Sequence, residues 1–349
     1  MISLLKDKGV FNINKTTVNI IAEIGINHDG DVNKAFKLIE AAKKCGADIV
    51  KFQAHLPDEQ MLRDTKAADY VKGSIYDLLS KVSLSFDDFV QIKKCCDDNE
   101  IEFMCTPFSN KAVDWLEEIG VKRYKIGSGE LTKLDFIKYI AQKSKPVIFS
   151  TGMSTLGEVK ETLDLLSSYH NEIVVMQCVS LYPPTYDQIN LNVLDYYREM
   201  IKAYPKSKIE LGFSDHSKDN YACIGAVAKG VKYIEKHFTL NKNDDGPDHA
   251  ISADTDDFKS LVKDIRIMER CCGTSEKTVY DEELPVIKMA RHSLVLLRDV
   301  EPGEKLTEDN LGTRRPGDGI PANEFYNYLN KTAKRHLKKN TLLLRQDVT

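Results

Sequence analysis

The sequence predicts an α/β protein whose larger part is a (β/α)8 TIM barrel. Eight apolar runs of strand length alternate with amphipathic segments of helical spacing between residues 18 and 271. Eight parallel strands joined by helical crossovers over such a length are typical of this barrel. An open doubly wound sheet would require a glycine fingerprint after the first strand, but residues 24–30 (IGINHDG) lack the G-x-G-x-x-G phasing.

The elements follow from apolar periodicity. We expect strands at 18–24, 48–53, 101–105, 122–127, 146–151, 173–178, 208–213 and 231–238. We expect helices at 31–45, 86–98, 109–119, 133–143, 155–168, 190–203, 218–230 and 255–271. The helix N-caps should be Asp31, Ser109 and Ser154, and the glycines that end helices should be Gly46, Gly120 and Gly230.

Composition shifts divide the chain into domains. Residues 1–272 should form the barrel, with residues 1–17 as an N-terminal cap that turns at residues 7–9. Residues 273–290 are polar and indicate a linker, and residues 291–349 are enough for a small second domain. Within the barrel, residues 54–85 form a long loop before the next helix, and loops of this length are often functional.

Charge and cysteine usage exclude several classes of protein. A net charge of −4 argues against nucleic acid as a partner. The eight cysteines show no CxxC spacing and no disulfide pattern, which fits a reducing compartment. No run approaches the length of a membrane span, and the N-terminus has no signal-peptide core. We therefore expect a cytoplasmic protein without a membrane partner.

Two histidines close consecutive apolar runs. His216 follows GFSD and His237 follows YIEK, and residues 218–230 between them are helix-like. One strand–helix–strand unit would place the two strands about 4.8 Å apart, so both imidazoles could bind one ion. A single histidine in an apolar run is usually a hydrogen-bonded core residue. Two at equivalent strand ends, beside Asp215, favour a metal site.

Polar residues at the predicted strand ends should converge on the mouth of the barrel. Lys51 and Lys125 are embedded in apolar runs, where an unpaired lysine is very rare. With the nearby hydroxyl groups they would suit a phosphate and a carboxylate; those hydroxyls belong to Thr106, Ser128 and Ser150. The alternative is that both lysines are exposed at strand ends.

Two acidic residues are also candidates. Glu23 lies within IIAEIG, and a carboxylate there should pair with a cation or act as an acid or base. Asp248, in the turn GPDHA, could accept hydroxyl groups of a sugar, although an aspartate in a turn commonly caps its own backbone.

Taken together, the motifs resemble the sialic acid synthases. IAEIGINHDG, DIVKFQ, YKIGSGE, STGM, GFSDHS, EKHFT and GPDHAIS, followed by RRPGDGI, resemble the family of N-acetylneuraminate, legionaminate and pseudaminate synthases. The resemblance implies a barrel followed by a small antifreeze-like (SAF) domain. It also implies a metal-dependent condensation of phosphoenolpyruvate with an N-acetylmannosamine-type aldose and water, which gives a nine-carbon 2-keto acid and phosphate. The metal would be Mn²⁺ or Mg²⁺.

The resemblance also implies roles for individual residues. His216 and His237 would bind the metal, with Glu23 close by. The phosphoenolpyruvate contacts would be Lys51, Thr106, Lys125, Ser128, Ser150 and Ser214, and the sugar contacts Gln53, Glu130, Tyr182 and Asp248. Arg315 would enter the partner's barrel in a domain-swapped homodimer. Ser180 stands where some N-acetylneuraminate synthases carry asparagine, which leaves its contact on the phosphate side and the identity of the sugar open.

In the implied reaction the metal polarises the aldehyde, Glu23 stabilises charge or positions water at C2, and Lys51 and Lys125 neutralise the departing phosphate. Two enzyme alternatives remain: a related phosphoenolpyruvate-dependent synthase acting on a phosphorylated aldose, and a Schiff-base aldolase using one of the lysines. A sugar-binding protein with an inactive barrel should lack the two histidines or Glu23, and all three are present. Nitrogen and oxygen ligands admit several divalent ions, so the choice of metal stays open.

Overall fold

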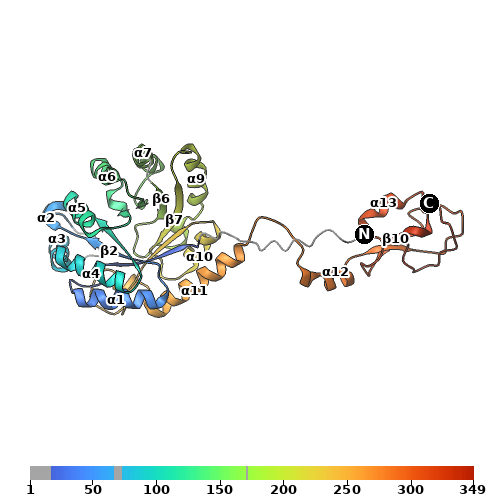
Figure 1. Ribbon diagram of the computed structural model, residues 1–349, viewed down its shortest axis with the longest axis horizontal. Coiled ribbons are helices and arrows are strands. Elements are labelled where there is room, and N and C mark those ends of the chain that lie inside the picture. The colour runs from blue at the N-terminus through green and yellow to red at the C-terminus, as the bar shows by residue number, and fades with distance from the viewer. Residues whose placement is uncertain (1–16, 67–72, 170–171) are drawn as a thin grey trace. The chain divides into compact units, whose positions relative to one another are not determined.

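The computed structural model of the chain describes residues 17–66, 73–169 and 172–349 (Figure 1). The chain divides into two compact units, the first ending at Gly273 and the second beginning at Thr274. The cap predicted at residues 1–17, with its turn at residues 7–9, lies outside the described residues except for Thr17.

The first unit contains an eight-stranded parallel barrel. Its strands are β1 Asn19–Gly25, β2 Ile49–Ala54, β3 Glu102–Pro107, β4 Tyr124–Ile126, β5 Val147–Ser150, β6 Ile173–Cys178, β7 Ile209–Asp215 and β8 Tyr233–His237. They are hydrogen-bonded in the order β3-β2-β1-β8-β7-β6-β5-β4, and β3 also lies beside β4, so that the sheet curls into a nearly closed ring. The predicted (β/α)8 barrel is confirmed, and each predicted strand boundary lies within two residues of the observed one.

Helices surround the strands (Figure 1). The main helices are α1 Val32–Cys45, α4 Phe86–Asp98, α5 Asn110–Ile119, α6 Leu134–Ala141, α7 Leu156–Ser167, α9 Val193–Met200, α10 Tyr221–Ala228 and α11 Thr255–Cys272. Asp31 caps α1 as predicted, but the predicted cap Ser154 is wrong. Thr155 caps α7 instead, because it forms a reciprocal capping box with Glu158. Among the described residues no helix combines the length and the apolar character needed to cross a membrane.

The long connection after β2 contains two short helices. Residues 54–85 contain α2 Pro57–Gln60 and α3 Ile75–Val82, so the prediction of an uninterrupted loop is wrong. Ser74 caps α3 by accepting a hydrogen bond from the Asp77 N–H, and Leu79 and Val82 anchor the helix through their burial. The connection after β6 contains a further short helix, α8 Tyr186–Ile189.

The barrel interior has two layers, because alternate residues of each strand point inward. The lower layer is apolar and consists of Ile21, Ile49, Met104, Ile148, Val174, Met176 and Tyr233. Two residues further along six of these strands, the inward positions are polar: Glu23, Lys51, Thr106, Ser150, Cys178 and Glu235. The apolar layer therefore closes the barrel below a polar layer at its carboxyl end.

The second unit has its own small core. Strands β9 Ser293–Leu296 and β10 Leu311–Arg314 pair antiparallel, and the short helices are α12 Leu284–Ala290 and α13 Phe325–Tyr328. The buried cluster includes Leu294, Leu296, Val300, Leu306, Leu311, Leu337 and Leu343. Residues 273–290, where the sequence indicates a linker, thus include helix α12.

Candidate active site

A cavity of about 350 Å³ opens at the carboxyl end of the barrel, within the usual size range of small-molecule sites. All of the sequence-predicted site residues except Arg315 line it: Glu23, Lys51, Gln53, Thr106, Lys125, Ser128, Glu130, Ser150, Ser180, Tyr182, Ser214, His216, His237 and Asp248. Arg315 belongs to the second unit, where its Nε donates to the Ala290 carbonyl oxygen at 3.0 Å. The barrel thus brings together side chains from all eight strand ends.

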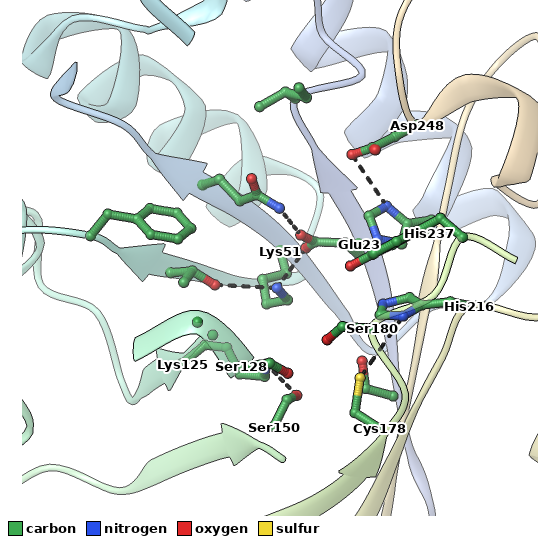
Figure 2. A pocket seen from close by; sticks show the side chains of 18 of the residues that line it. Glu23, Lys51, Lys125, Ser128, Ser150, Cys178, Ser180, His216, His237 and Asp248 are labelled. Carbon is green, nitrogen blue, oxygen red and sulfur yellow. Dashed lines mark hydrogen bonds and ion pairs between the residues drawn. The ribbon is translucent and has the colours of Figure 1, made fainter. Parts of the chain in front are cut away.

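Two buried lysines and two buried glutamates form the floor of the cavity. Figure 2 labels three of them, Glu23, Lys51 and Lys125. Lys51 Nζ lies 2.9 Å from Glu23 Oε2 and 3.5 Å from Glu235 Oε1. Lys125 Nζ lies 3.7 Å from the same Glu235 oxygen and donates to Ser150 Oγ at 2.7 Å. The two formal positive charges of the lysines are therefore balanced by the two formal negative charges of the glutamates.

Burial and the neighbouring charges set the ionisation of these groups. Burial alone would raise the pKa of Glu235, but Lys125 and Lys51 lower it to about 2. Burial raises the pKa of Glu23 despite the opposing effect of Lys51. Burial lowers the pKa of Lys125, whereas Glu23 and Glu235 raise the pKa of Lys51 against the effect of burial. The two lysines are thus electrostatically distinct, and Lys125 is the more readily deprotonated.

The two histidines stand at the same height on neighbouring strands. Asp215 pairs with Lys236, so the next residues, His216 and His237, are level, and their ring centroids are 5.5 Å apart. Asp215 itself does not face them: its carboxylate forms a buried ion pair with Lys236 at 2.6 Å. The aspartate that lies near His237 is Asp248, 3.8 Å from Nδ1 (Figure 2).

The imidazole nitrogens suit a metal ion. His216 Nδ1 donates to the Val179 carbonyl oxygen at 2.7 Å, so Nε2 is the nitrogen that can face an ion. Against the lowering effect of burial, Cys178 and the Val179 carbonyl raise the pKa of His216 to about 9, so a metal ion would bind Nε2 by displacing a proton. His237 Nδ1 is buried and makes no hydrogen bond to any described residue. Burial lowers the pKa of His237 to about 4, so the ring is neutral near pH 7 and can act as a ligand. A buried, neutral nitrogen that makes no hydrogen bond to the described residues fits a bound cation.

A second group of possible metal ligands lies nearby but already holds an internal cation. Oxygen and nitrogen atoms of Asp29, Asp244 and His249 lie within 4.8 Å of one another. Lys34 Nζ lies 2.5 Å from Asp29 and 2.6 Å from Asp244, which places an ammonium group between the two carboxylates. His249 is fully buried and contacts both Asp29 and Thr239, so it holds in place the turn that carries Asp248.

Close packing brings two of the predicted serines together. Ser128 Oγ accepts a hydrogen bond from the Gly152 N–H at 3.0 Å. A Cβ atom at position 152 would lie 2.1 Å from Ser180 Oγ and 2.9 Å from Ser128 Oγ. Glycine is therefore required for these hydroxyl groups to share one side of the cavity.

The sequence places Glu235 at the mouth of the barrel, at the end of a predicted strand, but assigns it no role, and it gives no indication of Cys178 as a site residue. Glu235 lies two positions before His237, so strand alternation alone puts both on the inner face. Cys178 occupies the inward position at the end of β6, and its Sγ lies 3.9 Å from His216 Nδ1. The sequence does not distinguish the Cys178 thiol from a core residue, because both occur in apolar runs. The alternation along β8 indicates that Glu235 shares the inner face with His237.

Glu130 should make the stability of the protein depend on pH. Burial raises its pKa to about 7, well above the 4.5 expected in the unfolded chain. The folded state therefore binds more protons between these values, and this carboxyl lowers the free energy of unfolding as pH rises through 7. Relative to the wild type, Glu130→Gln should gain about 2–3 kcal/mol of unfolding free energy between pH 5 and pH 8.

Urea unfolding at several pH values measures this difference. The exposed Glu118 offers a control, since Glu118→Gln should show the same pH profile as the wild type. A difference between the Glu130→Gln variant and the wild type that stays constant with pH would contradict the account.

An eight-stranded barrel with a buried, charged layer at its carboxyl end is the architecture of an enzyme. The sequence matches the NeuB family over residues 38–277 and the SAF domain over residues 291–349. The chain therefore belongs to the NeuB family, and its second unit contains a SAF domain, which confirms the predicted fold.

Relatives with named activities are similar over nearly their whole length. The chain is 37% identical to N,N'-diacetyllegionaminic acid synthase of Campylobacter jejuni, covering 93% of this chain and 98% of the relative. It is 36% identical to the enzyme of the same name from Legionella pneumophila, with 94% of each covered. A crystal structure of N-acetylneuraminic acid synthetase from Leptospira borgpetersenii, in complex with citrate, superposes with a TM-score of 0.70 at 28% identity, covering 78% of this chain and 90% of that one. These relatives identify the chain as an enzyme of the synthase class.

Proposed function

We propose that this enzyme condenses phosphoenolpyruvate with an N-acylated, mannosamine-type aldose and water to give a nine-carbon 2-keto sugar acid and phosphate. The observation that carries the proposal is the joint presence, in one cavity, of two buried lysines, two buried glutamates and two buried imidazoles. The names of the similar synthases support the same product class.

A divalent metal ion fits the two imidazoles. His216 Nε2 and His237 Nδ1 are the nitrogens that would hold it, by the hydrogen-bond pattern described above. When bound, Mn²⁺ or Mg²⁺ would polarise the aldehyde oxygen of the sugar as a Lewis acid. The charge balance of the cavity floor also favours a metal, because the lysines alone do not supply the excess positive charge that an anionic substrate requires.

The floor of the cavity suits phosphoenolpyruvate. Lys51 and Lys125, with the hydroxyl groups of Thr106, Ser128, Ser150 and Ser214, would bind its phosphate and carboxylate groups. Thr106 Oγ1 accepts a hydrogen bond from Lys51 Nζ at 3.2 Å, so its own proton is available to the substrate. Ser214 Oγ donates to Glu235 at 3.0 Å and would have to turn from that carboxylate to bind the phosphate. Ser180 would assist on the phosphate side, next to Ser128.

The proposed reaction forms one carbon–carbon bond and breaks the carbon–oxygen bond between C2 and the phosphate. C3 of phosphoenolpyruvate forms a bond to C1 of the open-chain aldose, and the aldehyde oxygen becomes a hydroxyl group. A water oxygen adds at C2, where Glu23 would hold the water and stabilise the developing positive charge. The C2–O bond to phosphate then breaks and the C2 carbonyl forms. Of the two protons of the water, one ends on the new hydroxyl group and one leaves with the phosphate.

The sugar would bind in the outer part of the cavity, above the buried lysines and glutamates. Gln53 Nε2 donates to Glu23 Oε1 at 2.7 Å, and Tyr182 stacks on His216 with 4.1 Å between ring centroids. With Glu130 and Asp248, these side chains offer donors and acceptors for the aldose hydroxyl and amide groups.

Phosphate release tests the proposal. The enzyme should release phosphate from phosphoenolpyruvate only when an N-acylated aldose and Mn²⁺ or Mg²⁺ are present, and a chelator should stop the reaction. Release with a phosphorylated aldose alone would favour the related synthase instead.

The lowered pKa of buried Lys125 specifically favours one competing function, a Schiff-base aldolase. Borohydride in the presence of pyruvate would inactivate such an aldolase by reducing the imine. We expect no inactivation, and full inactivation with a covalent adduct on Lys125 would replace our proposal.

We further propose that the enzyme is a domain-swapped homodimer in which Arg315 enters the partner's barrel. Large apolar side chains before β9 support a covering partner, since Tyr280 and Met289 are 67% and 60% exposed. Arg315→Ala should raise the KM for the aldose about tenfold or more while sedimentation still shows a dimer. An unchanged KM, or a monomer in the wild type, would contradict this arrangement.

All eight cysteines are unpaired thiols, which supports a reducing compartment and hence the cytoplasm as the location of the enzyme.

A further inference from the structure

His55 is a buried residue of the cavity to which the proposed condensation gives no role. It directly follows β2, lines the cavity and is 6% exposed. Its ring stacks on the ring of Phe108, with 4.3 Å between the centroids and 14° between the planes. This packing fixes the plane of the imidazole, so its two nitrogens point in set directions.

Each nitrogen of His55 faces the side-chain amide of a glutamine. Nε2 lies 2.9 Å from Gln53 Oε1. Nδ1 lies 3.1 Å from Gln60 Nε2 and 3.2 Å from Gln60 Oε1. Gln60 is the last residue of α2, and its Oε1 accepts a hydrogen bond from the Leu56 N–H at 3.3 Å. The imidazole therefore connects α2 to the amide of Gln53.

Glu23 sets the direction of these hydrogen bonds. Its Oε1 accepts from Gln53 Nε2 at 2.7 Å, and its Oε2 lies 2.9 Å from Lys51 Nζ, as expected for a carboxylate. Because the amide nitrogen of Gln53 is engaged by Glu23, the amide oxygen faces His55 and requires a donor. His55 therefore carries its proton on Nε2, and Nδ1 accepts from Gln60. Burial lowers the pKa of His55 to about 4, so the ring is neutral near pH 7.

The donors thus form a chain with a single direction. Gln60 donates to His55, and His55 donates to Gln53, which in turn donates to the carboxylate of Glu23. A flip of the Gln53 amide would turn its oxygen toward the carboxylate and its NH2 group toward the imidazole N–H, and both contacts would be repulsive. Space is also limited, since a Cβ atom at Gly25 would lie 3.2 Å from Gln53 Nε2 and 3.3 Å from Glu23 Oε1.

Resting on the proposed function, in which Glu23 holds the water at C2, we infer that His55 is a positioning residue for this glutamate. It acts through Gln53. By keeping the amide nitrogen toward Glu23, it holds one carboxylate oxygen in place and leaves the other to Lys51. A histidine with only a structural role would support the fold without setting the direction of this amide.

Replacing His55 with phenylalanine tests the inference. The variant keeps an aromatic ring against Phe108 but removes both nitrogens, so the Gln53 amide is free to flip. The kcat for phosphate release should fall at least about tenfold, while the KM for phosphoenolpyruvate stays within about twofold because both lysines remain. His55→Gln should recover most of the lost kcat, since a glutamine amide can place an N–H where the imidazole Nε2 lies.

A double-mutant cycle separates positioning from a general structural effect. Because His55 acts through Gln53, the effects of His55→Phe and Gln53→Met on kcat should not add. In the Gln53→Met background, His55→Phe should change kcat by less than about twofold. A structural effect would be the same with and without Gln53→Met.

Two adjacent residues of α2 offer a matched pair of variants. Gln60→Met removes the donor to Nδ1, so the proton of His55 can move to that nitrogen, and kcat should fall about threefold. Glu59→Met alters an exposed side chain that does not line the cavity, and kcat should not change. Equal values of kcat for these two variants would contradict the chain of donors.

The tautomer of His55 provides a measurement that needs no turnover. In enzyme labelled with ¹⁵N-histidine, the signal that His55→Phe removes should have the chemical shifts of a neutral ring protonated at Nε2. A ring protonated at Nδ1, or additive effects in the cycle with Gln53→Met, would overturn the role of His55 and leave the condensation intact. Absence of phosphate release by the wild type would instead overturn the proposed function.

Discussion

Replacing His237 with alanine should lower kcat/KM by about a thousandfold and abolish the response of the enzyme to added Mn²⁺. His237 Nδ1 is buried without a hydrogen-bond partner among the described residues, so the fold does not depend on a bond from this atom. The ring is neutral near pH 7 and is free to bind a cation. The substitution should therefore remove metal binding and leave the circular dichroism spectrum unchanged. Phosphate release and calorimetric titration with Mn²⁺ measure the two effects.

A second buried histidine serves as the control. His28 is 1% exposed but does not line the cavity. His28→Ala should lose stability like any buried truncation and yet keep its affinity for Mn²⁺. Metal-dependent turnover within tenfold of the wild type in the His237→Ala variant would remove the basis for the metal assignment.

Replacing Lys51 with methionine should cost about 3–5 kcal/mol of unfolding free energy as well as activity. The substitution leaves Glu23 and Glu235 buried without their shared cation, while Lys125 compensates only Glu235. Adding Glu23→Gln should restore most of the lost stability, because it removes the uncompensated charge. Activity should not return, since the phosphate-binding cation is still missing. Urea unfolding and phosphate release on the single and double variants check both expectations.

Lys236 offers a matched control for Lys51. It lies on β8, is equally buried and forms an ion pair with Asp215 at 2.6 Å, but it does not line the cavity. Lys236→Met should lose a similar amount of stability and retain the activity of each folded molecule. If both variants lost activity to the same extent, Lys51 would have only a structural role.

The barrel was predictable because its periodicity is strong, whereas local details were not. Eight apolar runs set the strands, and burial of both faces makes such runs nearly continuous. Residue type alone predicts Ser154 as the cap of α7, but the Thr155–Glu158 capping box fixes the cap at Thr155. The composition of residues 54–85 predicts a loop, because the apolar stripe of α3 is short and lies within a polar connection.

The sequence predicts which residues lie near the site, because the carboxyl ends of all barrel strands converge on one mouth. It does not predict which of them face the cavity. Lys51 and Lys236 are both lysines in apolar strands. Lys51 faces the cavity, whereas Lys236 faces away from it and pairs with Asp215. Only the register of each strand separates them. For the same reason Asp215 looked like a neighbour of His216, whereas it points away and Asp248, distant in sequence from His216, lies beside His237.

The position of the bond that breaks tests the account most directly. Phosphoenolpyruvate labelled with ¹⁸O in the oxygen that bridges C2 and phosphorus should be incubated with the enzyme, Mn²⁺ and an N-acylated aldose. The account predicts that the label leaves in the phosphate, and that the new C2 carbonyl oxygen comes from water. Label retained at C2 of the sugar acid, or no coupled release of phosphate at all, would contradict the proposed condensation.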